Sequence, residues 1–396
     1  MGMLIKEGQR FTFTGMAKLS LIAFIVSFAS ALITTIWAVY LDSFLGSTVG
    51  VAILSAFLSL IAFSSYFVFI PMVEKYDKAN IFFYSLLIGI PLYALIAFAT
   101  NFYVFFILAF FSTVLVTLRV TSFGIIIKDR SPKGQLSKNE GLLFSFMNLS
   151  WVIAPLVAGY VASVSGAKYV FLLSTLFFFF GLVLFKTGNI RDGHVKKNLH
   201  IGMKKNFLDF FKNRDRIFAY IIGGGPVMWF SLIYLFIPLY IIRSGLDKLW
   251  IGYFLFAISV PLILTEYKFS KMAGKVGFRK MFVAGFIFVA IVSFVCFFVS
   301  NIYVLMSLLV LASFGMAMIE PTSEAYFFDV LKKGDASRFY GPYNTRADVT
   351  GLVARIFSIF VLAFLPFKFL FILFGLFMIV MVFFAFRMKD FVEQTK

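Results

Sequence analysis

Two carboxyl side chains, Glu320 and Glu324, stand four residues apart inside a long apolar segment. On a helix this spacing puts both on one face. Two carboxylates in a poorly hydrated site repel each other, and desolvation favours the neutral form, so one of them is expected to hold a proton. Such a group can load and release a proton as its surroundings change. For Glu324, the alternative is simple hydration, because Asp329 follows only five residues later.

Charged side chains also occur in other apolar segments. Arg119 lies nine residues before Lys128, a depth of about 13 Å along a helix. Arg355 lies about 20 Å inside its segment, which also contains Asp348. Ionisable residues at such depth normally face a cavity or a partner. Arg119, Asp348 and Arg355 are therefore candidates for the same cavity as the glutamates, and the alternative is a structural Arg355–Glu320 pair.

Other features of the apolar segments are weaker signals. Gly223, Gly224, Gly225 and Pro226 form a run that interrupts a helix or permits close packing of small residues. Glu266 and Arg346 are expected near the membrane surface, with Arg346 solvated or snorkelling. Four aromatic residues offer surfaces to a substrate or pack in the core: Trp37, Tyr40, Trp229 and Tyr234.

The segments that must position these residues are long and apolar. Of the 396 residues, 61% are hydrophobic and only 14% charged, which excludes a water-soluble enzyme. Unbroken apolar runs predict transmembrane helices, whereas barrel strands would alternate. The sequence therefore predicts an all-α membrane protein with twelve transmembrane helices. The predicted spans are Leu19–Tyr40, Ser47–Ile70, Ile81–Thr100, Phe102–Ile127, Gly141–Ala162, Tyr169–Phe185, Ile217–Ile242, Leu249–Tyr267, Met281–Val299, Ile302–Phe328, Gly341–Leu365 and Phe369–Phe386.

Basic residues predict how the chain crosses the membrane. The termini and the even-numbered loops together hold 29 of the 36 Lys and Arg. The positive-inside rule therefore predicts a multi-pass protein of the cell membrane with both termini in the cytoplasm. The net charge of +18 is a topology signal with some attraction for membrane lipids, and it does not indicate a nucleic acid partner. The first span is expected to be retained rather than cleaved as a signal peptide.

A polar, basic segment divides the chain into two halves. We expect an N-terminal bundle at residues 1–185, a cytoplasmic central loop at 186–216 and a C-terminal bundle at 217–396. Within the loop, Asn206–Lys212 is an amphipathic surface helix or part of a mobile tether. The halves repeat weakly at an offset of 200 residues. The matches include Lys75 with Lys275, Asp129 with Asp329, and Gly141 with Gly341.

This organisation resembles the major facilitator superfamily of transporters. Degenerate copies of that family's loop motif occur after the second and eighth spans. The first keeps Glu74 and Lys75 but has Asp77 for the glycine, and the second keeps Gly277 and Arg279 but has Gly274 for the acid. Ala154-Pro155 through Gly159 is similar to the helix-kinking motif of antiporters. The resemblance implies two pseudo-symmetric six-helix bundles and a cytoplasmic gate at Glu74, Lys75, Asp129, Lys275, Arg279 and Asp329.

The resemblance implies a monomeric secondary active transporter that moves a small solute by alternating access. Glu320, Glu324 and Asp348 favour proton coupling, as an antiporter or a symporter, and two deep arginines suit a polar or anionic metabolite. Arginines paired with these acids would instead leave a site for drug-like solutes. The alternatives are a non-transporting receptor or scramblase on the same fold, or an intramembrane enzyme.

Several observations argue against an enzyme and against a cofactor. Both histidines, His194 and His200, lie in the central loop and not in a span. The sequence has no P-loop for nucleotide hydrolysis. The single cysteine, Cys296, excludes an intrachain disulfide and a cysteine metal cluster. We therefore expect no enzymatic activity, no cofactor and no metal.

Overall fold

The computed structural model describes residues 15–130, 136–188, 190, 203–331 and 335–389. Every regular element in this part of the chain is helical. The elements are α1 (Gly15–Leu45), α2 (Thr48–Lys75), α3 (Lys78–Ala97), α4 (Phe102–Arg130), α5 (Leu136–Val164), α6 (Ala167–Thr187), α7 (Met203–Phe210), α8 (Arg214–Ser231), the π-helical turn η1 (Leu232–Phe236), α9 (Ile237–Arg243), α10 (Leu249–Val276), α11 (Phe278–Phe298), α12 (Ile302–Val330), α13 (Ala336–Asn344), α14 (Arg346–Phe364) and α15 (Phe369–Arg387).

Twelve spans in the described residues are long and apolar enough to cross a membrane, which confirms the all-α prediction. The seventh span, Arg214–Arg243, combines α8, η1 and α9, and the eleventh, Arg338–Phe364, includes α14 and most of α13. Side-chain caps mark several starts: Ser47, Asp77 and Asn301 each accept a hydrogen bond from a backbone N–H of the first turn. Most boundaries fall within a few residues of the prediction. The clear exception is α10, which continues nine residues beyond the predicted end at Tyr267.

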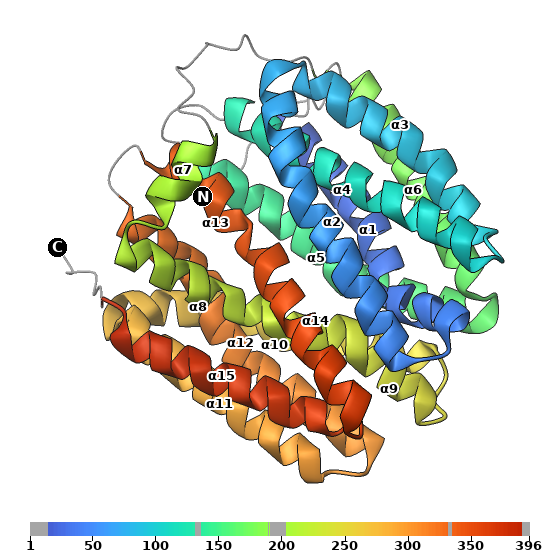
Figure 1. Cartoon of the computed structure of the whole chain (residues 1–396). Helices are drawn as coiled ribbons and strands as arrows, with labels where there is room; N and C mark the ends of the chain where they lie inside the picture. Colours follow the sequence, from blue (N-terminus) through green and yellow to red (C-terminus); the bar gives the residue numbers. More distant parts are fainter. Residues whose placement is uncertain (1–14, 131–135, 189, 191–202, 332–334, 390–396) are drawn as a thin grey trace, which may run out of the picture.

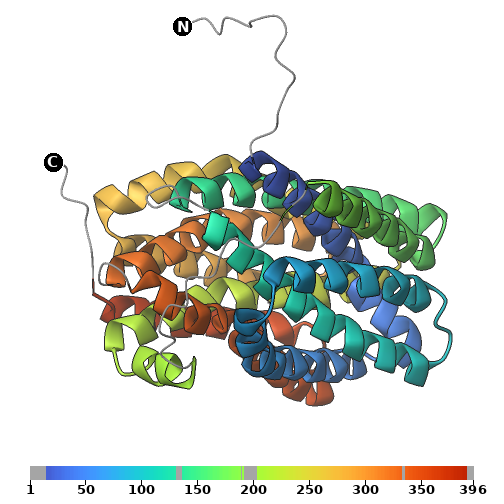
Figure 2. The ribbon, with the colours of Figure 1, turned by 90° about the horizontal axis from the view of Figure 1, so that it is seen from above.

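The helices run side by side along one direction, with the two halves of the chain packed against each other (Figures 1 and 2). In the first half, α1 packs on α5 and α6, and α3 on α4 and α6. In the second half, α11 packs on α12 and α15, and α10 on α12. The halves meet mainly through α5 against α10 and α2 against α14. Because the number of spans is even, α1 begins and α15 ends at the same end of the bundle, here named the termini end (upper left in Figure 1).

At the opposite end, the two halves are in direct contact. Arg243 Nη2 donates to Asp42 Oδ1 at 2.8 Å, an ion pair that joins α9 to α1. The Ser163 hydroxyl of α5 is hydrogen-bonded to Asp247, which precedes α10, and holds the pKa of that carboxyl below its ordinary value. These two contacts connect the first half to the second at the end of the bundle opposite the termini.

The backbones of α5 and α10 also approach closely near this end. A Cβ atom at Gly252 would lie 2.5 Å from the Pro155 carbonyl oxygen, and one at Gly159 would lie 2.9 Å from the Gly252 Cα. Glycine at both positions is therefore what allows the helices to meet. The crossing closes the opposite end between the two halves.

Candidate functional site

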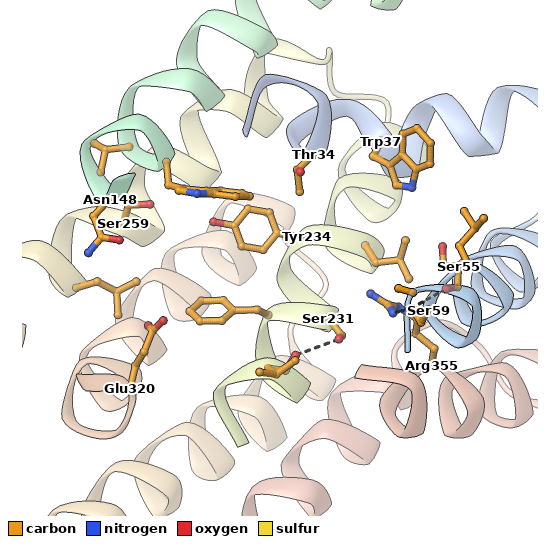
Figure 3. Close-up of a pocket in the computed structure, with 18 of the residues that line it drawn as sticks. Thr34, Trp37, Ser55, Ser59, Asn148, Ser231, Tyr234, Ser259, Glu320 and Arg355 are labelled. Carbon is orange, nitrogen blue, oxygen red and sulfur yellow. Dashed lines mark hydrogen bonds between the residues drawn. The ribbon is translucent and has the colours of Figure 1, made fainter. Parts of the chain in front are cut away.

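A cavity of about 600 Å³ lies between the two halves (Figure 3). Its size is in the usual range for a small-molecule site. The N-terminal half contributes Thr34, Trp37, Ser55, Leu58, Ser59, Ala62, Thr113, Asn148, Trp151 and Val152. The C-terminal half contributes Val227, Phe230, Ser231, Tyr234, Leu235, Ser259, Leu262, Ile263, Glu266, Glu320 and Arg355.

The lining follows the internal repeat of the sequence. In the first half it comes from α1, α2, α4 and α5, and in the second from α8 with η1, α10, α12 and α14. These are the corresponding first, second, fourth and fifth spans of each half. Three pairs of lining residues occupy equivalent positions, 200 residues apart, in the two halves: Thr34 and Tyr234, Ser59 and Ser259, and Ala62 and Leu262. The cavity is therefore built on the pseudo-symmetry that the loop matches predict.

One side of the cavity is acidic and aromatic. Glu320 of α12 and Glu266 of α10 both line it, and Glu266 is close enough for its charge to act on Glu320. Tyr234 packs edge-on against Trp151 of the other half, with ring centroids 5.8 Å apart. A pair of carboxyls beside aromatic faces can hold a proton or a substrate ammonium group.

The predicted surface position of Glu266 is wrong. The span was expected to end at Tyr267, which would put Glu266 at the membrane surface, but α10 continues to Val276. Glu266 therefore lies ten residues, about 15 Å, before the end of the helix. Ser259 and Glu266 are seven residues apart and therefore share one face of α10. This helical spacing is the sequence signal that could have placed Glu266 in the cavity.

The other side of the cavity is basic. Arg355 Nη1 donates to the Ser59 hydroxyl across the boundary between the halves. Among the described residues, the buried Arg355 Nε and Ser55 Oγ have no hydrogen-bond partner. The charge of Asp348 on the same helix acts on Arg355, but no ion pair joins Arg355 to a described carboxylate. The alternative of a structural Arg355–Glu320 pair is therefore wrong. Figure 3 shows the two side chains on opposite sides of the cavity, with Tyr234 between them.

Glu324 and Asp348, two other predicted members of the site, do not line the cavity. Glu324 accepts from Arg346 Nη2 at 3.0 Å, and this ion pair joins α12 to α14. The Arg346 guanidinium also stacks on the Tyr343 ring, 3.8 Å from its centroid. Arg346 therefore has a structural role, because it links two helices. The sequence predicted only a solvated or snorkelling side chain and did not indicate this ion pair. Asp348 is half-buried in the first turn of α14.

Arg119 is separate from the cavity as well. Its side chain is 3% exposed inside the N-terminal half, between α4 and its neighbours. The guanidinium lies over the Phe178 ring of α6 at 4.5 Å, and Nη2 makes a long contact of 3.5 Å with Ser30 Oγ of α1. The prediction that it faces the cavity is therefore wrong. Its depth was read correctly, but depth does not tell which face of a helix a side chain occupies.

The predicted helix break at Gly223, Gly224, Gly225 and Pro226 is absent, because α8 continues through these residues. None of them lines the cavity, and neither does Pro155, which lies inside the uninterrupted helix α5. The glycines instead allow close packing: a Cβ atom at Gly224 would lie 2.3 Å from Thr350 of α14. The irregular turn of this span is η1, which follows α8 and includes the cavity residue Tyr234. π-helical turns inside helices are frequent at functional sites.

We predict that Gly224→Ala lowers the stability of the folded protein. The added methyl group must displace Thr350, and such overpacking typically costs about 1–3 kcal/mol. Thermal unfolding of the purified protein in detergent would measure the loss. Gly124→Ala is the matched control, because a Cβ there meets nothing within 4 Å. Equal midpoints for both variants would show that the close packing at Gly224 is not needed.

The aromatic candidates divide between the two expected roles. Trp37 and Tyr234 line the cavity. Tyr40 and Trp229 are buried in the packing, and the Tyr40 hydroxyl donates to the Ile96 carbonyl of α3.

The side chains of Glu74, Lys75 and Asp129, three of the predicted gate residues, lie outside the described part of the structure. Of the others, Lys275 and Asp329 are exposed, and no ion pair joins these two described side chains. Arg279 Nη2 donates to the Met388 carbonyl at 2.6 Å, which ties α11 to the end of α15.

Comparison with known proteins agrees with this architecture. The family model of the major facilitator superfamily matches residues 19–267 and 259–395. An uncharacterized MFS-type transporter of Methanocaldococcus jannaschii is 26% identical over 161 residues, which cover 39% of this chain and only 41% of that relative.

Solved structures share the fold over most of their length. A POT family transporter in complex with a thioalcohol-conjugated peptide has a TM-score of 0.78 and 11% identity, over 94% of this chain and 95% of that one. A peptide transporter in complex with sulfate has a TM-score of 0.76 and 14% identity, over 96% and 95%. A POT family transporter in complex with 5-aminolevulinic acid has a TM-score of 0.77 and 11% identity, over 94% and 95%. The chain belongs to the major facilitator superfamily and is an integral, multi-pass membrane transporter rather than an enzyme.

Proposed function

We propose that this protein is a proton-coupled secondary active transporter of a small solute that carries both an amino and an acidic group. The observation that carries the proposal is the cavity between the halves, with two carboxyls on one side and, on the other, an arginine whose Nε has no hydrogen-bond partner among the described residues. In secondary transporters, substrate and coupling-ion sites lie at the interface between repeats.

Alternating access requires a second state in which the cavity opens at the other end. The contacts at Asp42–Arg243 and Gly159–Gly252 close the end opposite the termini. The distribution of basic residues supports cytoplasmic termini in a cell membrane, so the described conformation corresponds to the inward-facing state. In the outward-facing state these contacts separate, and the gate residues at the termini end come together.

Proton coupling is assigned to Glu320 with Glu266. Two neighbouring carboxyls in a poorly hydrated cavity are most stable when they share one proton, since a second negative charge would be repelled. Opening of the cavity to water, or an ammonium group beside the pair, favours release of that proton. Glu324 is left out of this role, because it is neutralised by Arg346 outside the cavity.

The opposite charges of the two sides support a zwitterionic substrate. Arg355 Nε and Ser55 Oγ have unused hydrogen-bonding capacity, which suits a carboxylate or another oxyanion. The carboxyl pair with Tyr234 and Trp151 suits an ammonium group. Structural neighbours hold a conjugated peptide and 5-aminolevulinic acid, and the latter carries an amino and a carboxyl group.

We predict that Arg355→Met weakens substrate binding by about 10- to 150-fold, which corresponds to the about 1.5–3 kcal/mol of a hydrogen bond to a charged group. The measurement is the half-saturation concentration for exchange of radiolabelled substrate across proteoliposomes. Arg346→Met is the matched control, since this arginine binds Glu324 away from the cavity. Equal affinities in wild type and Arg355→Met would remove Arg355 from the substrate site.

The substrate is found by thermal stabilisation of the purified protein against a panel of amino acids, short peptides, organic anions and lipophilic cations. Each compound that binds is then tested for accumulation in proteoliposomes with an imposed proton gradient. We expect stabilisation by zwitterions and accumulation of the same compounds. Binding without accumulation would indicate a receptor on the same fold, and binding of cations alone would contradict the assignment of Arg355.

A further inference from the structure

The short helix α7 and the residues that follow it carry an exposed apolar and basic surface that does not line the cavity. The helix belongs to the segment between the sixth and seventh spans and lies at the termini end of the bundle (Figure 1). Only three residues separate its end at Phe210 from the start of the seventh span at Arg214. It therefore lies at the level where a span leaves the hydrocarbon and enters the headgroup layer.

One face of α7 is fixed on the C-terminal half. Phe210 is fully buried, with its ring centroid about 6 Å from those of Tyr220 and Phe339. Arg216 caps the end of the helix, because its Nη2 donates to the Asp209 carbonyl at 2.6 Å and its Nε to the Phe210 carbonyl at 3.1 Å. Arg338 of α13 bonds Asn206 and forms an ion pair with Asp209. These contacts set the orientation of the helix.

The exposed side of α7 continues through Phe211 and Lys212 to Arg214 at the start of α8, and it mixes apolar with basic side chains. Leu208 is 59% exposed and Phe211 is 42% exposed, outside the predicted spans. Lys205, Lys212 and Arg214 beside them are exposed as well. Lys212 also bonds Asp209 and holds the pKa of that carboxyl below its ordinary value, yet 74% of the lysine side chain stays open. An apolar strip flanked by lysine and arginine is the pattern of a helix that lies in a membrane surface.

The neighbouring contact indicates which way this face points. Phe207 of α7 packs on Phe67 of α2, with ring centroids 5.4 Å apart. Phe67 belongs to an exposed stripe of α2 with Ile53, Phe57 and Leu60, on a different face from the cavity residues Ser55 and Ser59. This stripe lies in a predicted span and so faces lipid. The helix α7 therefore joins the lipid-facing flank of the bundle rather than the mouth of the cavity.

We infer that the α7 surface, defined as Lys205, Leu208, Phe211, Lys212 and Arg214, binds anionic phospholipid headgroups. Leu208 and Phe211 enter the boundary between headgroups and acyl chains, and the three basic residues bind phosphate groups. Each basic residue near an anionic membrane surface raises the equilibrium constant for membrane binding about fivefold. Because α7 is fixed to α13 and bonded by Arg216 of α8, bound lipid anchors the C-terminal half at the termini end.

The test uses the full-length protein with a nitroxide spin label at Leu208→Cys, in a Cys296→Ala background that removes the single native cysteine. The label's collision rates with oxygen and with a water-soluble nickel complex report whether it lies in lipid or water. They are compared in vesicles of phosphatidylcholine alone and in vesicles with about a third of it replaced by phosphatidylglycerol. We expect the label to lie in lipid, and to lie deeper when phosphatidylglycerol is present.

The variant K205Q/K212Q/R214Q is expected to lose the dependence on phosphatidylglycerol. The matched control is K268Q/K271Q/K280Q, which removes the same charge from exposed residues of α10 and α11 and should keep the dependence on phosphatidylglycerol. A label that is accessible to water in both kinds of vesicle would overturn the inference. It would indicate that the α7 surface binds a soluble partner instead of lipid. An unchanged phosphatidylglycerol effect in the α7 variant, or equal loss in the control, would overturn the assignment to these three residues.

Discussion

Glu320→Gln is expected to abolish uphill transport while leaving exchange of substrate across the membrane intact. Glutamine imitates the protonated carboxyl, so the cavity can still bind substrate and alternate, but no proton is carried. One proton driven by about 100 mV is worth about 2.3 kcal/mol, or about a 50-fold accumulation of substrate. In proteoliposomes that contain the variant, the substrate concentrations inside and outside should become equal. Exchange of labelled for unlabelled substrate should continue.

The control for this variant is Glu324→Gln. It removes a carboxyl one helical turn away that is paired with Arg346 and does not line the cavity. Its folding is checked by thermal unfolding, because it leaves Arg346 without its partner. Proton-driven accumulation should persist in the control. Uphill transport retained in Glu320→Gln with an unchanged dependence on pH would exclude Glu320 from the coupling site.

Gly252→Ala should shift the protein strongly away from the described conformation. The added methyl group would lie 2.5 Å from the Pro155 carbonyl oxygen, which belongs to a helix backbone and cannot move as a side chain can. Overpacking of this kind costs about 1–3 kcal/mol, enough to change the ratio of the two states by about 5- to 150-fold. The cost applies only where α5 and α10 are in contact, so the opened state is favoured.

The shift is measured as the distance distribution between spin labels on α1 and α9 at the end opposite the termini. We expect the short distance of wild type to be replaced by a longer one in Gly252→Ala. Gly89→Ala is the control, because its nearest neighbour would lie at 3.8 Å, an ordinary contact. A short distance that persists in the Gly252 variant would mean that the α5–α10 crossing does not hold this end closed.

The fold was largely predictable because lipid imposes a simple rule on the chain. Runs of about 20 apolar residues must be helices, so the number and order of the spans follow from hydropathy alone. The boundary of α10 was not predictable in this way, since polar residues such as Glu266 and Lys268 occur before the helix ends. That single error moved Glu266 from the cavity to the surface.

The candidate site was predictable in part. Depth in the membrane correctly selected Glu320 and Arg355, since charges there need a cavity or a partner. Depth alone also selected Arg119, which is buried inside the N-terminal half, and Asp348, which does not line the cavity although its charge acts on Arg355. Ser55 and Ser59 carry no signal in one sequence, because serine is common where transmembrane helices pack. Which face a helix presents is decided by its neighbours, as the close contacts of Gly224 and Gly252 show.

Proton movement on addition of substrate decides whether transport by this protein is coupled to protons. Proteoliposomes that contain wild-type protein and a pH-sensitive dye are given the zwitterion that stabilises the protein best. We expect a proton flux that follows substrate, is absent without it, and disappears in Glu320→Gln. Substrate that equilibrates across the membrane with no proton movement in wild type would exclude proton coupling, and Glu320 and Glu266 would then serve binding alone.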